Sequence, residues 1–185
     1  MSNLAINIPF ALANENELSF TPFADTDDKG VKLYRDGMSG LGASVNVITT
    51  MVDGKPAGFT ATAVTSVTDA PPTLLVCLNR SSSVFSVFDK AEYLCVNTLA
   101  AGQETVSGVF ASKLNQAERF DSVEWQQFVT GSPALNAAST VFDCRISSRI
   151  SVGTHDVFFC EVLGVGQTEQ ASNLVYFNRK YHSLV

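Results

Sequence analysis

The sequence predicts a mainly β protein, an antiparallel barrel that is either closed or split, with short helices on its rim. From residue 43 the period of the sequence changes to two, in β-branched runs such as ASVNVITTMV and GFTATAVTSVT, which is the pattern of strands. Turn residues such as Asp53-Gly54 and Gly153 separate neighbouring runs, as expected for antiparallel hairpins. Beyond an amphipathic helix at the start, only three short segments are typical of helices.

The first predicted element is an amphipathic helix over residues 28–41, because Val31, Tyr34 and Met38 recur at steps of three and four. Two β-branched strands follow, and the turn between them makes them antiparallel neighbours. Strands are expected over residues 43–52, 58–68, 73–79 and 93–99, followed later by a long hairpin of 139–152 with 156–167 and a last strand over 173–178. Between these strands we expect a serine-capped helix over 81–90, a helix over 103–111, and loop and short helix over 112–138.

The length of 185 residues corresponds to about one domain. Residues 1–30 hold five of the 18 acidic residues and one of the 12 basic ones. We therefore expect an acidic N-terminal extension over residues 1–30, either a disordered tail or an arm laid across a partner. A single domain over residues 31–185 should follow it.

Composition excludes several classes of function. No basic stripe exists, so we expect no nucleic-acid partner, and no apolar run is long enough for a membrane helix. The first residues lack the positive charge of a secretory signal, and the four cysteines lie in apolar stretches without metal-ligand spacing. We expect a cytoplasmic protein with buried thiols and no metal site. Charged residues are only 16%, so a second subunit or a ligand should cover apolar surface.

Familiar catalytic motifs are missing from the sequence. It has no phosphate-binding GxxxxGK[ST] loop, no GxGxxG that opens a helix, no GxSxG and no HExxH. What stands out is a run of hydroxyl and small residues at 60–66, followed by the polar segment 79–83. Together they could admit a flat ligand that carries a phosphate. A threonine-rich strand followed by a capped helix is the alternative interpretation.

Several blocks point to a known family. The run RDGMSGLGASVNVITT, the run DGKPAGFTATAVTSVTDAPPTLLVCLNRSSS, and then CVNTLAAGQETVSGVFA, SPAL, GTHDVFFCEV and LVYFNRKYHSL occur in this order. They resemble the short-chain NAD(P)H:flavin reductases, and more narrowly the reductase component of two-component 4-hydroxyphenylacetate 3-monooxygenase. The resemblance covers residues 31–184 and implies a homodimeric FMN-binding split β-barrel of Greek-key type. It also implies hydride transfer from NADH or NADPH to FMN, FAD or riboflavin, and diffusion of the reduced flavin to a monooxygenase.

The same resemblance implies a set of site residues. Residues 60–62 match the strand that meets the isoalloxazine edge, Thr65 and Ser66 match positions near the ribityl chain and phosphate, and the polar segment 79–83 matches the phosphate site. The residues expected to bind flavin or its partner are Thr60, Ala61, Thr62, Thr65, Ser66, Asn79, Ser81, Ser82, Ser83, Phe110 and Tyr181.

His155 is the expected catalytic residue, on the nicotinamide side. It matches the histidine of the family's Gly-Asp-His turn, with Thr154 in place of the aspartate. The alternative for His155 is a turn residue without function. The alternative for Phe110 is a role in core packing alone. Tyr181 and His182 are expected to cover the nicotinamide.

Two other classes of function remain open from the sequence. One is a flavin- or haem-binding split barrel that does not oxidise NADH, and the other is an interaction protein on the same barrel. The choice between FMN and FAD, the choice between NADH and NADPH, and the identity of the oxygenase also stay open.

Overall fold

The computed structural model describes residues 28–169 and 172–185. The predicted extension over residues 1–30 therefore lies almost entirely outside the described residues. Helix α1 (Asp28–Ser39) confirms the predicted amphipathic helix and ends before Gly40. Residues 37–185 form one compact unit.

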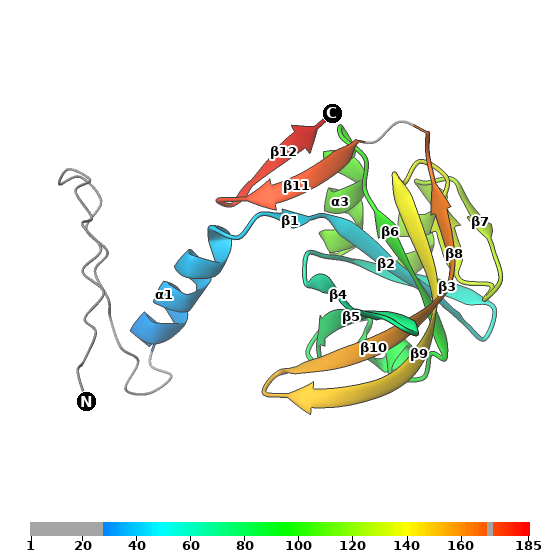
Figure 1. Ribbon diagram of the computed structural model, residues 1–185, viewed down its shortest axis with the longest axis horizontal. Coiled ribbons are helices and arrows are strands. Elements are labelled where there is room, and N and C mark those ends of the chain that lie inside the picture. Colours follow the sequence, from blue (N-terminus) through cyan, green and yellow to red (C-terminus); the bar gives the residue numbers. More distant parts are fainter. Residues whose placement is uncertain (1–27, 170–171) are drawn as a thin grey trace, which may run out of the picture. The chain divides into compact units, whose positions relative to one another are not determined.

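A seven-stranded antiparallel sheet dominates this unit, in the order β3-β2-β6-β9-β10-β5-β4 (Figure 1). Its two edge strands, β3 and β4, are joined only by Thr62 and Ala63, so the sheet must curl until its edges meet. This arrangement confirms the split barrel. The strands are β2 (Asn46–Val52), β3 (Lys55–Ala61), β4 (Val64–Asp69), β5 (Pro72–Asn79), β6 (Tyr93–Thr98), β9 (Thr140–Val152) and β10 (His155–Gln167).

The single strand predicted over residues 58–68 is wrong, because it comprises the end of β3 and most of β4. The chain bends where the Val64 N–H donates to the Thr62 carbonyl at 2.9 Å. β3 then pairs with β2, whereas β4 pairs with β5. The alternation of apolar and polar residues lapses at Ala63 and Val64, which are both apolar, but a lapse of this kind does not by itself reveal a change of strand partner.

Two smaller sheets complete the strands of the described chain. β1 (Ala43–Ser44), β11 (Asn173–Phe177) and β12 (Lys180–Leu184) form one, and β7 (Trp125–Gln127) with β8 (Pro133–Leu135) forms the other. The predicted strand over residues 43–52 divides at Val45, whose N–H donates to Leu174 at 2.8 Å. The strands β7, β8 and β12 were not predicted.

Three further helices are α2 (Phe85–Phe88), α3 (Glu104–Ala111) and α4 (Gln116–Asp121). The predicted serine cap of α2 is wrong, because the N-cap residue is Val84 and no side chain caps it. The serines instead belong to the preceding turn, where the Asn79 carboxamide oxygen accepts hydrogen bonds from the N–H and the hydroxyl of Ser81 at 2.9 and 2.8 Å.

The core consists of two apolar clusters. The first fills the barrel and includes Ile48, Phe59 and Phe158, with Phe59 edge-on to Phe88 at 5.0 Å. The second includes the fully buried Phe110, which packs edge-on against Phe120 at 5.2 Å. The four cysteines are free, and Cys77 alone of them is only half-buried. No helix among the described residues is long and apolar enough to cross a membrane.

Candidate functional site

A cavity of about 480 Å³ lies where the barrel splits. This volume falls in the range of small-molecule sites. Its walls come from the end of β3, the link to β4, the end of β5, the segment before α2, the region of α3 and α4, and the start of β10. The lining residues are Phe59, Thr60, Ala61, Thr62, Ala63, Cys77, Leu78, Asn79, Ser82, Ser83, Val84, Phe110, Ala111, Ser112, Arg119 and His155.

One wall is the outer edge of strand β3. The Gly58 N–H donates to the Gln116 Oε1 at 2.7 Å, and the Gly58 carbonyl accepts from the Arg119 Nη1 at 2.8 Å, so α4 occupies the edge at that point. Backbone groups alternate in direction along a strand, which places the N–H and carbonyl of Thr60 on the same outer edge. The Thr60 hydroxyl is committed to the Ser107 carbonyl at 2.7 Å. The cavity thus meets a strand edge through the backbone of Thr60.

Small side chains keep this wall open. Ala61, Ala63 and Ala111 all line the cavity. A Cβ on Gly58 would stand 2.9 Å from the Phe110 ring, which shows how closely that ring packs on the strand. A flat aromatic ligand can therefore approach the backbone closely.

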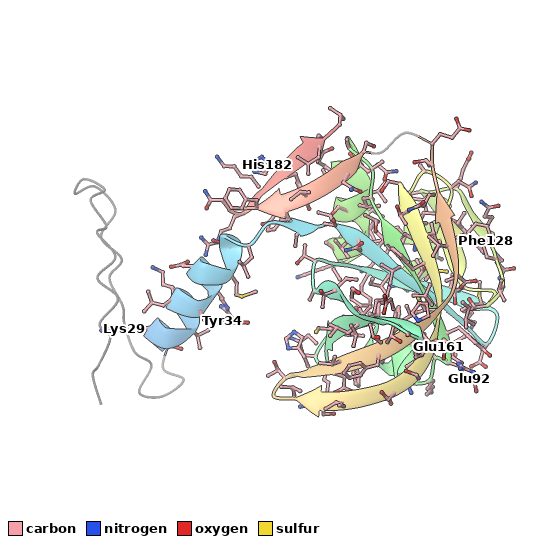
Figure 2. The ribbon with its side chains drawn as sticks, in the orientation of Figure 1. Lys29, Tyr34, Glu92, Phe128, Glu161 and His182 are labelled. Carbon is pink, nitrogen blue, oxygen red and sulfur yellow. The ribbon has the colours of Figure 1, made fainter. Side chains whose placement is uncertain are left out.

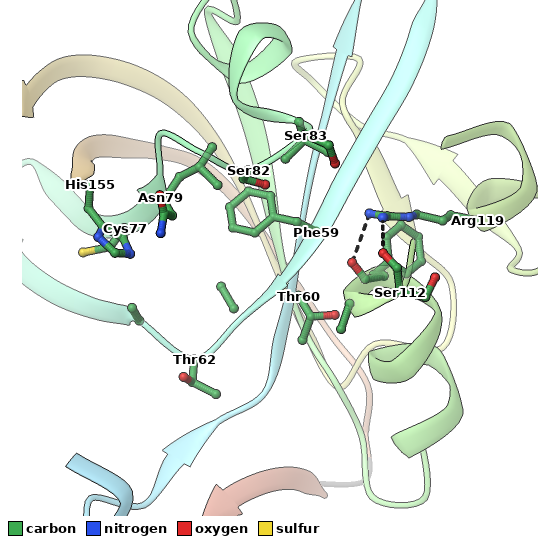
Figure 3. A pocket seen from close by; sticks show the side chains of 16 residues that line it. Phe59, Thr60, Thr62, Cys77, Asn79, Ser82, Ser83, Ser112, Arg119 and His155 are labelled. Atoms are coloured by element: carbon green, nitrogen blue, oxygen red, sulfur yellow. Dashed lines mark hydrogen bonds between the residues drawn. The ribbon is translucent and has the colours of Figure 1, made fainter. Parts of the chain in front are cut away.

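A hydroxyl-rich segment forms a second wall. Ser82 and Ser83 line the cavity together with Asn79 (Figure 3). The Ser82 N–H donates to the Asn79 carbonyl at 3.0 Å, which closes the turn. Ser81 is absent from the lining, because its hydroxyl is bound to Asn79. The two hydroxyls are donors suited to an anionic group.

The buried guanidinium of Arg119 is the site feature that the sequence analysis missed. Arg119 is only 4% exposed, and burial lowers the pKa of its guanidinium. It donates to the carbonyls of Gly58, Phe110, Ser112 and Leu114 at 2.7 to 3.1 Å. It therefore fastens α3 and the following loop to β3 and leaves a positive charge beside the cavity. An arginine on a short helix is ordinarily exposed, so no signal in the sequence marks it.

His155 stands at the cavity as the first residue of β10, directly opposite Asn79 of β5. Its Nδ1 lies 2.9 Å from the Thr154 hydroxyl. In Figure 3, His155, Asn79 and Cys77 gather at one end, whereas Arg119 and Ser112 stand at the other. Burial raises the pKa of the Cys77 thiol, so it is protonated at neutral pH and is not poised as a nucleophile.

The structure brings most of the expected residues together. One cavity collects eight of those named from the sequence, from elements far apart in the chain. They are Thr60, Ala61, Thr62, Asn79, Ser82, Ser83, Phe110 and His155.

Other expected residues lie elsewhere. Thr65 and Ser66 line a different groove, of about 400 Å³, beside β10. The Tyr181 hydroxyl lies 2.9 Å from the Ser107 hydroxyl, and its ring packs on Tyr176. His182, on the β11–β12 hairpin, packs on Phe177 (Figure 2). In this chain alone, these residues do not line the cavity at which His155 stands.

Comparison with known proteins supports one family. The model for the flavin reductase like domain matches residues 38–185. The FMN reductase (NADH) RutF of Pseudomonas syringae pv. syringae is 54% identical over 151 residues, which is 82% of this chain and 85% of that protein. RutF of Serratia proteamaculans is 50% identical over 165 residues, which is 89% of this chain and 91% of that protein.

A solved structure agrees with these relatives. Flavin reductase PheA2 superposes with a TM-score of 0.75 at 30% identity, over 86% of this chain and 99% of that one. The resemblance seen in the sequence blocks is thereby confirmed at the level of the family. With a split barrel, a cavity at the split and relatives of this identity and coverage, the chain belongs to the flavin reductase like family.

Proposed function

We propose that this protein is an NADH:FMN oxidoreductase that binds flavin in the cavity at the barrel split and releases it reduced. The observation that carries the proposal is the convergence of a strand edge, small apolar residues, a hydroxyl-rich segment and a histidine on one cavity. Relatives at 50% and 54% identity are FMN reductases that use NADH, which supports FMN and NADH over FAD and NADPH.

The residues present fit a flavin. An isoalloxazine is flat and carries donors and acceptors along its pyrimidine edge, which matches the backbone edge at Thr60 and the small residues beside it. Phe59 and Phe110 supply apolar surface for the rest of the ring system. Ser82 and Ser83 supply hydroxyl donors for the phosphate, and the Arg119 charge favours an anion nearby. Four other residues expected at the flavin site do not line this cavity, namely Thr65, Ser66, Ser81 and Tyr181. They would belong to the site only through contacts with the flavin or NADH outside this cavity.

The protein's chemical task is then mainly positioning. Bound side by side, NADH supplies a hydride and the flavin accepts it. The β3 edge and the Ser82–Ser83 pair orient one partner, and His155 is placed to hydrogen-bond the carboxamide or a phosphate of the other. The fixed Arg119 charge stabilises negative charge that develops in the cavity, because it is already oriented by four carbonyls.

The proposal extends to a partner. Reduced FMN would diffuse to a flavin-dependent monooxygenase, and an oxygenase of the 4-hydroxyphenylacetate type, active in aromatic catabolism, is the first to assay because of the sequence resemblance. Adding that oxygenase to the reductase, FMN and NADH should yield hydroxylated product only when all components are present. If no hydroxylated product forms with this oxygenase, the reduced flavin serves a different oxygenase.

We also infer a homodimer. Apolar side chains are exposed on β4 and β10, namely Val67, Leu163 and Val165, and of these Val165 lines the second groove. A second copy covering this face agrees with the low charge content. Light scattering should give about twice the chain mass of 19.8 kDa, and a monomer at micromolar concentration would contradict this.

The catalytic domain is proposed to be residues 31–185, with residues 1–30 as an extension, because the family match begins at residue 38. Removing residues 1–30 should leave NADH oxidation intact. The four free thiols favour a cytoplasmic location.

The test of the main proposal is the loss of NADH absorbance on addition of flavin. NADH should be oxidised only when free FMN is supplied, and more slowly with NADPH. Flavin binding without NADH turnover would favour an electron-transfer or storage role for the same barrel. Absence of flavin binding would refute the site.

A further inference from the structure

The turn that presents His155 leaves two carbonyls without partners inside the hairpin. β9 ends at Val152 and β10 begins at His155, and Gly153 has a φ of 55°. Glycine at the first central position of a two-residue hairpin loop is typical of a type II′ turn. The hydrogen bonds that close the turn join the flanking residues Val152 and His155, so they do not use the carbonyls of Gly153 and Thr154.

Both carbonyls receive a donor from Arg80, which lies directly after β5. The Arg80 N–H donates to the Thr154 carbonyl at 3.0 Å, and its Nη2 donates to the Gly153 carbonyl. Arg80 is not among the residues that line the cavity. Its guanidinium therefore contacts the turn before His155 and does not line the cavity.

A buried carboxylate holds the other side of this guanidinium. Asp156 is 7% exposed, and its Oδ1 lies 3.8 Å from the Arg80 Nη1. The same oxygen accepts a hydrogen bond from the Ser151 hydroxyl at 2.8 Å. Because successive side chains of a strand point to opposite faces, Asp156 anchors β10 on the face opposite to His155.

From these contacts we infer that Arg80 is a positioning residue that holds His155 at the cavity for NADH. It joins the turn before His155 to the end of β5, where Asn79 stands opposite the histidine. The inference rests on the proposed function, since it requires that His155 meets NADH. The guanidinium contacts Gly153 and Asp156, whereas the serine segment is held by its own hydrogen bonds to Asn79. Flavin binding should therefore be nearly independent of Arg80.

The test is a double-mutant cycle of Arg80→Met with His155→Ala in the full-length protein. Arg80→Met keeps the apolar stem and removes the guanidinium, and it should raise the KM for NADH about tenfold with the Kd for FMN within about twofold of the parent value. Loss of folded protein would lower the maximal rate and leave KM unchanged. Adding Arg80→Met to His155→Ala should raise KM no further, because Arg80 acts through the histidine.

Two variants sharpen the measurement. Arg80→Lys supplies a single point charge that can reach the carbonyl or the carboxylate but not both, so its KM should be intermediate, and it carries the cycle if Arg80→Met does not fold. Arg145→Met is the matched control, because it removes a guanidinium from the β9–β10 hairpin that Arg80 contacts. Arg145 pairs at 2.5 Å with Glu161, which is labelled in Figure 2, and neither residue lines the cavity. Its KM should equal that of the parent.

The outcomes separate the two claims. If His155→Ala leaves the KM for NADH unchanged, the proposed role of His155 is overturned and that of Arg80 with it. If His155→Ala raises KM but Arg80→Met does not, or if the two effects multiply, only the Arg80 inference is overturned. An equal rise with Arg145→Met would also overturn it, because any disturbance of the hairpin would then suffice.

Discussion

Gly58→Ala tests whether the packing of Phe110 on β3 shapes the cavity proposed to bind flavin. The new Cβ would stand 2.9 Å from the Phe110 Cε1 and 3.0 Å from the Ile48 carbonyl oxygen, whereas ordinary contact begins at 3.4 Å. The ring would have to move by about half an ångström. It cannot move freely, because it is fully buried and packed edge-on against Phe120.

The magnitude follows from two opposing effects. Overpacking a well-filled core costs about 1–3 kcal/mol, and removing a glycine from a strand returns about 0.5–1 kcal/mol. The midpoints of these two ranges leave a net loss of a little over about 1 kcal/mol, which corresponds to a Tm lower by about 2–5 °C for a chain of this length. Since Phe110 lines the cavity, the Kd for FMN should rise about five- to tenfold.

The assay is thermal unfolding together with FMN titration, and the matched control is Gly108→Ala. Gly108 lies in α3, two residues from Phe110, and a Cβ there would meet nothing within 4 Å. That variant should gain up to about 1 kcal/mol of stability and keep its FMN affinity. Adding Phe110→Leu to Gly58→Ala should recover part of the lost stability. If Gly58→Ala matches the parent in Tm and in FMN affinity, the reasoning is refuted.

Three further predictions concern the cavity. Replacing Ser82 and Ser83 by Asp should weaken FMN binding more than about tenfold but spare riboflavin, which lacks the phosphate; equal losses in the two titrations would remove the pair from the phosphate site. His155→Ala should lower kcat/KM for NADH about 10–100-fold with flavin affinity kept, and stopped-flow reduction at the parent rate together with unchanged NADH affinity would leave His155 a turn residue. Alkylation of Cys77 by iodoacetamide should be slow at pH 7 and faster as the pH rises, because the raised pKa keeps the thiol protonated. FMN should protect the thiol, because Cys77 lines the cavity. Rapid labelling at pH 7, or no protection by FMN, would contradict the placement of Cys77 in a flavin-binding cavity.

Features that depend on short segments of sequence were predictable. The hairpin turns at Asp53-Gly54 and Gly153 occur as expected, because glycine and aspartate adopt the required positive φ at low cost. Helix α1 and the long β9–β10 hairpin follow from their hydrophobic periods. The serine cap of α2 failed because Asn79, outside the helix, competes for the same serine groups.

The prediction of where the site lies depended partly on the resemblance to the flavin reductases. Threonine and serine runs at residues 60–66 and 79–83 suggest a polar site, but they do not distinguish Thr60, which lines the cavity, from Thr65, which lines another groove. The bend between β3 and β4 separates the two threonines, and the sequence marks it only by the adjacent apolar residues Ala63 and Val64.

By itself the sequence determined the mainly β class, the hairpin turns and the family, because these reside in local pattern and in motif order. Only the tertiary structure decided that the edges of one curled sheet meet at Thr62 and Ala63. It also decided that a buried Arg119 lies beside the cavity and that Arg80 holds the turn before His155. Burial and partner choice are set by residues distant in the chain: the Gly58 carbonyl for Arg119, and the Gly153 carbonyl for Arg80. No local pattern encodes such pairs, since the same arginines on isolated segments would face water.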